Sequence, residues 1–218
     1  MIIKISQAAS NIKQSYDIES DGFYYSAKAG SFSRLQDITM TSQTDTIKGT
    51  YRIPNLVNFV PLRHIFGKAN LTRVFNLYRN DDHYGTFVYS KHGLFKSCYI
   101  ITLTGGEIFY CYCRSIGSFD YVSIYHNDVQ IALVETYLSV NDYKYVHKLY
   151  ILDDFDNYAN TLSFYVIYYA SYAFAQRMHM SSGSVSAKSW SFSRYNNKYD
   201  PKWRETHFPD ENFFGRIL

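Results

Sequence analysis

Residues 158–175 read YANTLSFYVIYYASYAFA, a stretch of eighteen uncharged residues that Asp156 precedes and Arg177 follows. The stretch contains neither proline nor glycine, and its four alanines favour a helix. Acidic residues from Asp153 onward suit the positive end of a helix dipole, and Arg177 suits the negative end. The sequence therefore predicts a helix over about residues 157–177.

The predicted helix is apolar on every face, with Leu162 and Val166 on one side and Phe164 and Ile167 on others. A helix of this kind is buried either in protein or in a membrane. The stretch barely reaches the roughly 20 residues that span a bilayer. Its five tyrosines favour membrane interfaces over the hydrocarbon centre. We therefore expect protein around this helix, and no transmembrane span.

The chain before the helix reads as short strands separated by tight turns. Closely joined strands must be antiparallel, and an open sheet of them would expose two edges. We therefore predict a mainly β (α+β) fold, a closed antiparallel β-barrel around a central apolar C-terminal helix. The expected strands span residues 2–6, 22–27, 73–79, 85–90, 96–103, 107–114, 121–125, 130–138 and 143–152.

Two regions depart from this pattern. Residues 28–50 are rich in Ser, Thr, Gln and Asp and predict an irregular connection, and residues 55–69 predict a short helix that Pro61 interrupts. We expect one barrel domain over residues 1–180, with an insertion at about 28–70. The C-terminal extension, 181–218, holds more aromatic residues than a disordered tail usually does. We expect it to pack back on the barrel; a docking segment for another protein is the alternative.

Three cysteines flank a Gly-Gly pair at residues 105–106: Cys98 precedes it, and Cys111 and Cys113 follow it. Gly-Gly between alternating runs predicts a hairpin. A two-residue turn at 105–106 places Cys98 opposite Cys113, and a turn at 104–105 places it opposite Cys111. Either register puts all three sulfurs on one face. A metal or redox site is one interpretation. Structural zinc usually takes four ligands, so we favour small residues that pack against the helix.

No pattern of catalytic residues occurs in the chain. The seven histidines are scattered without an HExxH pair, and no GxSxG, Walker loop or GxGxxG is present. The acidic run at residues 153–156 lacks the spacing of a calcium loop. A net charge of +3 does not argue for nucleic-acid binding. We expect no enzyme, no cofactor and no metal. The first residues lack a secretory signal core, so we expect a cytoplasmic location, with peripheral membrane attachment as an option.

Five segments carry a resemblance to a known family: GTFVYSK, CYIITL and GEIFYCYC, followed by IALVET and KYVHKLYIL just before the apolar helix. Their order resembles the tubby C-terminal-like superfamily, which includes the LURP-one-related proteins and the phospholipid scramblases. The likeness covers about residues 70–176 and is nearest to the LURP-one kind. It implies a twelve-stranded barrel around a central apolar helix.

The same resemblance implies a non-enzymatic binding module that engages phospholipid headgroups at a membrane surface or another protein. Some tubby proteins bind phosphoinositides through basic residues on the barrel, but no motif places those residues in this chain. A solvated charged face is the simpler interpretation of the basic residues here. The alternative function is an accessory or immunity-like interaction protein of a mobile element, without a lipid role. The candidate lipid or partner surface comprises Arg73, Arg79, Lys91, Arg114, Lys144 and Lys148.

Overall fold

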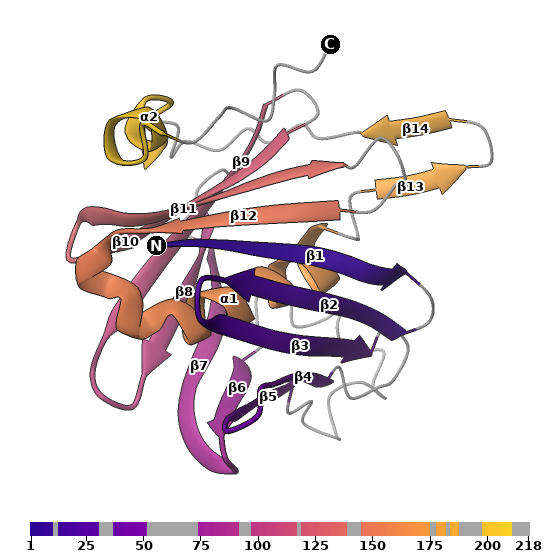
Figure 1. The fold of residues 1–218 in the computed structure, drawn as a ribbon, viewed down its shortest axis with the longest axis vertical. Helices are drawn as coiled ribbons and strands as arrows, with labels where there is room; N and C mark the ends of the chain where they lie inside the picture. Colours follow the sequence, from indigo (N-terminus) through magenta and orange to yellow (C-terminus); the bar gives the residue numbers. More distant parts are fainter. Residues whose placement is uncertain are drawn as a thin grey trace, which may run out of the picture.

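Twelve strands form one closed antiparallel barrel, in which each strand pairs with its neighbours in sequence and β1 pairs with β12 (Figure 1). The computed structural model describes residues 1–10, 13–30, 37–51, 74–91, 97–116, 119–138, 145–174, 178–181, 184–187 and 198–210. The barrel strands are β1 (Ile2–Ser10), β2 (Lys13–Ser20), β3 (Phe23–Gly30), β4 (Asp37–Thr41), β5 (Thr46–Tyr51), β6 (Val74–Arg79), β7 (Asp82–Lys91), β8 (Ser97–Leu103), β9 (Ile108–Ile116), β10 (Phe119–His126), β11 (Val129–Leu138) and β12 (Tyr145–Ile151).

One helical segment follows β12 directly. It begins as a 3-10 helix, η2 (Asp153–Tyr158), continues as α1 (Ala159–Tyr168) and ends as a π-helix, η3 (Tyr169–Phe174). The mainly β fold and the closed antiparallel barrel are therefore confirmed, as is a helix after the last strand. The predicted helix end at residue 177 lies outside the described residues. A small hairpin of β13 (Met178–Ser181) and β14 (Ser184–Ala187) and the short helix α2 (Trp203–His207) come later.

The residues of α1 pack against three neighbouring strands of the barrel, β6, β7 and β8. All side chains of residues 161–168 are buried. The ring of Phe164 lies 6.3 Å from that of Phe75 on β6 and 6.1 Å from that of Phe87 on β7, centroid to centroid. Tyr165 contacts Tyr99 on β8 at 5.9 Å. These aromatic contacts make the helix part of the same hydrophobic core as the strands.

The expectation of an irregular connection over residues 28–50 is wrong. β4 and β5 lie within this region and complete the ring between β3 and β6. Their outward positions carry polar residues, whereas Ile38, Met40, Ile47 and Gly49 alternate along the buried face. The amino-acid composition of residues 28–50 therefore resembled that of a loop, although the segment forms strands. β2 was not expected either. The short helix predicted over residues 55–69 lies outside the described residues.

The hairpin of β8 and β9 turns through three residues, so both expected two-residue registers are wrong. Leu103 and Glu107 form the last pair before the loop, since the amide of Leu103 donates to the carbonyl of Glu107 at 2.9 Å. Gly106 adopts a φ of 96°, which favours glycine. Tyr99, rather than Cys98, lies opposite Cys111. Cys98 is therefore on the opposite face of the sheet from Cys111, because side chains alternate along a strand.

Candidate functional site

Strands β9 to β12 present a row of polar and aromatic side chains on the outside of the barrel. Arg114, Tyr121, Glu135 and Lys148 lie opposite one another on four successive strands. They face outward because their neighbours along the strands belong to the buried core. A second outward-facing row on the same four strands lies two residues away and comprises Tyr112, Ser123, Leu133 and Tyr150. We call these eight residues, together with Tyr125, the outer wall.

The outer wall is covered by residues 198–208, here called the C-terminal segment. Figure 1 shows its helix α2 on the side of the barrel that β9 to β12 form. Trp203 packs with Leu133 and Tyr150 in a hydrophobic cluster separate from the barrel core. The ring of Phe208 lies 5.3 Å from that of Tyr150. β11 and β12 are consequently buried on both faces, which is unusual for an antiparallel strand.

A buried ion pair fixes the C-terminal segment to the wall. Arg204 is 4% exposed, and its Nε lies 3.4 Å from Oε1 of Glu135. The hydroxyl of Tyr150 donates to Oε2 of the same carboxylate at 3.3 Å. Burial raises the pKa of Glu135, and the charges of Arg204 and Lys148 oppose that rise. Removing one partner of such a pair is costly, because the other charge stays buried without compensation.

Aromatic rings and cations make the second contact between the segment and the wall. The ring of Tyr199 lies 5.0 Å from that of Tyr121, and the guanidinium of Arg114 lies 4.9 Å from the Tyr199 ring. Nζ of Lys198 lies 4.7 Å from the ring of Tyr125, whose hydroxyl donates to the Lys198 carbonyl at 3.1 Å. Burial raises the pKa of the Tyr199 phenol well above its usual range. Cation–π contacts of this kind strengthen as water is excluded.

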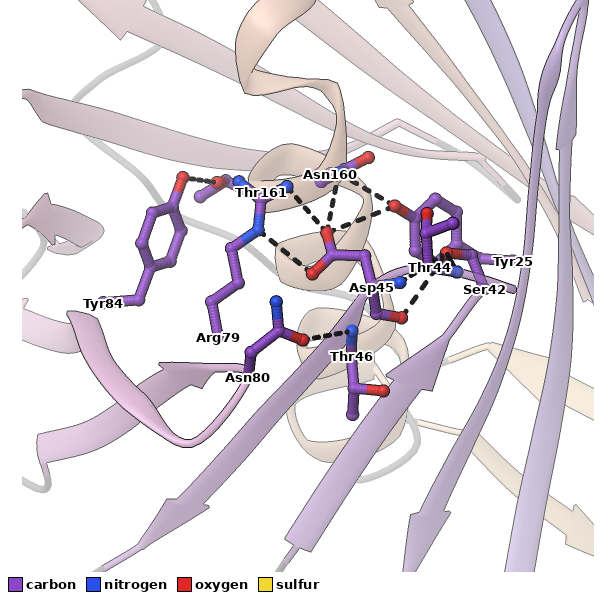
Figure 2. A network of polar contacts seen from close by, with 10 residues as sticks. All are labelled: Tyr25, Ser42, Thr44, Asp45, Thr46, Arg79, Asn80, Tyr84, Asn160 and Thr161. Atoms are coloured by element: carbon purple, nitrogen blue, oxygen red, sulfur yellow. Dashed lines mark hydrogen bonds and ion pairs between the residues drawn. The ribbon is translucent and has the colours of Figure 1, made fainter.

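A second polar cluster lies at one end of the barrel, around the buried carboxylate of Asp45 (Figure 2). Arg79 donates to it through Nε at 3.1 Å and forms an ion pair through Nη2 at 2.7 Å. The hydroxyl of Tyr25 and the amide of Asn160 each donate to Oδ2 at 3.3 Å. Figure 2 also shows the hydroxyls of Tyr84 and Thr161 in contact, 3.0 Å apart.

This barrel-end cluster connects the helix to the strands. Asp45 precedes β5, Arg79 ends β6, Tyr25 is on β3, and Asn160 is in the first turn of α1. The hydrogen bond with Asp45 raises the pKa of Arg79, so the cation persists at every ordinary pH. Both carboxylate oxygens are occupied by donors of the chain itself. We therefore interpret the cluster as a structural clamp between the helix and the β3–β7 side of the barrel.

A third polar group lies within the core, where Asp120, Thr136 and His147 face one another on β10, β11 and β12. Oγ1 of Thr136 and Nδ1 of His147 are 2.8 Å apart. The hydroxyl of Tyr169 donates to Asp120 at 3.5 Å. Burial lowers the pKa of His147 to about 4, so its imidazole is neutral at physiological pH. These buried groups position η3 against β10.

The cysteines do not form the single group that both expected registers implied. Cys111 and Cys113 lie beside Tyr165, whose hydroxyl is 3.9 Å from the sulfur of Cys113. Burial raises the pKa of Cys111 well above its usual value, which keeps it a thiol rather than a metal-binding thiolate. In the part of the chain that the structure describes, no group of three or more His, Cys, Asp or Glu side chains could hold a metal ion.

The predicted basic surface does not gather into one patch among the described residues. Arg79 belongs to the barrel-end cluster, whereas Arg114 and Lys148 lie in the outer wall, separated by Tyr121 and Glu135. Arg73 and Lys144 lie outside the described residues, as does the side chain of Lys91. No resolved helix within the described ranges is both long and apolar enough to cross a membrane.

The residues that hold the C-terminal segment on the outer wall were not predicted as functional residues. Glu135, Tyr150, Trp203 and Arg204 carry no motif. One signal was available: in IALVET and KYVHKLYIL, apolar residues occupy both faces of an antiparallel strand. Such a strand needs a cover on its outer face.

Comparison of the chain with protein-family models, with curated proteins and with solved structures gave no match.

Proposed function

We propose that this protein is a non-enzymatic binding module of the tubby C-terminal-like, LURP-one-related kind, with its apolar helix inside the barrel. The observation that carries the proposal is the spread of helix contacts around the ring of twelve strands. Side chains of α1 and η3 touch strand after strand, as the interior position requires. These contacts are Ser171 with Tyr16 on β2, Phe164 with Phe75 on β6 and Phe87 on β7, Tyr165 with Tyr99 on β8 and Cys113 on β9, and Tyr169 with Asp120 on β10.

A helix in this position leaves the outer surface as the place for binding. Aromatic side chains such as Phe164, Tyr165 and Tyr169 then fill the interior and are fully buried. Interfaces between proteins are enriched in aromatic residues and arginine. The outer wall has this composition, with tyrosines on three of its strands and Arg114 at its edge.

A polypeptide fits the described surface better than a lipid headgroup. Arg79 is paired with Asp45, Arg114 lies on Tyr199, and Lys148 is 9% exposed beside Glu135. A headgroup would have to displace each of these contacts. Lipid binding through Arg73, Lys91 and Lys144 is the alternative, which the described residues do not test. The cytoplasmic location and the option of peripheral membrane attachment stay predictions. The alternative of an accessory or immunity-like protein of a mobile element is tested by the functions of the neighbouring genes.

Two measurements test the proposal on the full chain. Flotation with neutral and with anionic liposomes should give no salt-sensitive binding, and selection from a displayed peptide library should yield peptides that bind the folded protein. Flotation that requires anionic lipid and disappears in salt would replace the polypeptide partner by a lipid. A library that yields no binder under conditions in which the protein is folded would count against a polypeptide-binding module. Elemental analysis of the purified protein tests the absence of a bound metal.

A further inference from the structure

We infer that the outer wall is a polypeptide-binding site and that the C-terminal segment occupies it as an intramolecular ligand. The partner is a polypeptide segment with a Trp-Arg pair followed by a second aromatic residue, the chemistry of Trp203, Arg204 and Phe208. This inference deepens the proposed function and rests on it.

The barrel closes without the C-terminal segment. All twelve strands find both neighbours within the ring, and residues 198–208 add no strand to it. The segment instead lies on an outer face and forms its own hydrophobic cluster around Trp203. The C-terminal segment thus covers the outer wall without contributing a strand to the barrel, in the way that a bound ligand would.

The contacts of the segment have the distribution found at protein interfaces. In such interfaces a few buried Trp, Tyr and Arg residues carry most of the binding energy, surrounded by exposed contacts of little weight. Trp203 and Arg204 are 5% and 4% exposed, respectively, and they occupy adjacent positions on the wall. At the edge, Lys198 pairs with Asp128 at 3.3 Å, and the Asp128 side chain is almost fully exposed.

The wall selects for the chemistry of its occupant. Leu133 and Tyr150 form an apolar floor for an indole ring, and the carboxylate of Glu135 lies beside it. Because burial already raises the pKa of Glu135, a neutral residue in place of Arg204 would leave a mostly buried carboxylate with only the Tyr150 hydroxyl and the charge of Lys148 to offset its burial. The wall therefore favours an aromatic residue next to a guanidinium over an aromatic residue alone.

The C-terminal segment is too short to keep its helical structure away from the outer wall. α2 has five residues, and isolated helices of that length are not stable in water. The conformation of α2 therefore depends on contact with the outer wall, just as linear motifs adopt their structure only on binding a partner. A tethered occupant has a high effective concentration, so it reduces the apparent affinity of the wall for any competing polypeptide.

The test uses the full chain with its anchors weakened and a peptide of residues 198–210, KYDPKWRETHFPD, labelled with a fluorophore. In Trp203→Ala/Arg204→Ala the tethered segment should leave the wall. Fluorescence anisotropy should then show the peptide binding this variant at least about tenfold more tightly than the wild-type chain. Adding Glu135→Gln to the variant should weaken that binding, and a peptide with Trp203→Ala and Arg204→Ala should not bind.

Equal binding of the peptide to wild type and to a folded double variant would overturn the inference. If the double variant does not fold, a chain with a protease site placed after Ala187 decides instead, because it is cut only after folding. Exchange of the cut segment for labelled peptide supports the inference, and retention of the segment against excess peptide contradicts it. Library peptides that bind elsewhere on the barrel would support the proposed function but contradict the inference that the outer wall is the binding site.

Discussion

Replacing Gly49 with alanine tests how the helix packs against the barrel. Gly49 is a buried residue of β5, and a Cβ added to it would collide with the ring of Phe75 and lie 2.8 Å from Cζ of Phe164 in α1. Both rings are fully buried and cannot simply rotate into solvent. Overpacking of this kind costs about 1–3 kcal/mol. Alanine restricts the unfolded chain and returns about 0.4–1 kcal/mol. We therefore expect a net loss of about 1–2 kcal/mol.

The assay is urea unfolding of four proteins: wild type, Gly49→Ala, Phe164→Leu and the double variant. Leucine removes the ring atom that meets the new methyl group, so Phe164→Leu should cost less in the alanine background than in wild type. The coupling free energy should reach about 1 kcal/mol, within the range for residues in contact. Gly30→Ala is the control, because among the described residues the atom nearest its added Cβ is the carbonyl oxygen of Asp37, at 3.9 Å.

An additive result in this cycle would refute the reasoning. It would mean that Phe164 does not press on the inner face of β5, and the proposal that the helix lies inside the barrel would lose a main support. A destabilised Gly30→Ala would instead show that alanine is disfavoured in these strands for reasons unrelated to the helix.

Three further perturbations test the core and the barrel-end cluster. Tyr165→Asp, or Ile167→Asp, should prevent folding, because a buried unpaired charge costs several kcal/mol of the roughly 5–15 available to a domain; a soluble variant with a cooperative melt would contradict the burial of the helix. His147 has a folded pKa of about 4, below its unfolded value of 6.5, so its contribution is complete above pH 6.5 and is lost as the pH falls towards 4. Wild type should lose about 2 kcal/mol more than His147→Gln between pH 7.5 and pH 5 in urea melts, and equal losses would show that His147 is not the group that titrates. Asp45→Ala should cost about 2–4 kcal/mol, because it leaves buried donors unpaired, and Arg79→Lys should cost less; similar thermal stability of Asp45→Ala and wild type would mean that the clamp is not needed.

The parts of the fold that the sequence predicted well are those fixed by local chemistry. The pairs Asn80-Asp81 and Asn127-Asp128 turn with positive φ at every residue, the geometry that asparagine and aspartate tolerate best. The uncharged run of residues 158–175 lacks proline and glycine and contains four alanines, so its composition favoured a buried helix. Strands bounded by such turns could therefore be located within a few residues.

The errors arose where the relevant information is not local. β4 and β5 are polar outside, and their inner positions are too few to stand out, as Ile47 and Gly49 show. Gly49 reads as a strand breaker in the sequence, but in the structure it makes room for the ring of Phe164. The loop at residues 104–106 differs from both expected turns by one residue, enough to move Cys98 to the other face of the sheet.

The position of the candidate site follows from a difference between two sides of the same barrel. On β3 the outward side chains are exposed, and Tyr24 keeps 61% of its surface in contact with solvent. On β11 and β12 the outward Leu133 and Tyr150 are almost completely buried, although a closed barrel alone gives no reason for apolar residues there. Exposed side by side, these residues would form an apolar patch of the kind that marks an interaction surface. The C-terminal segment prevents that exposure, so its removal and the arrival of a partner should be coupled events.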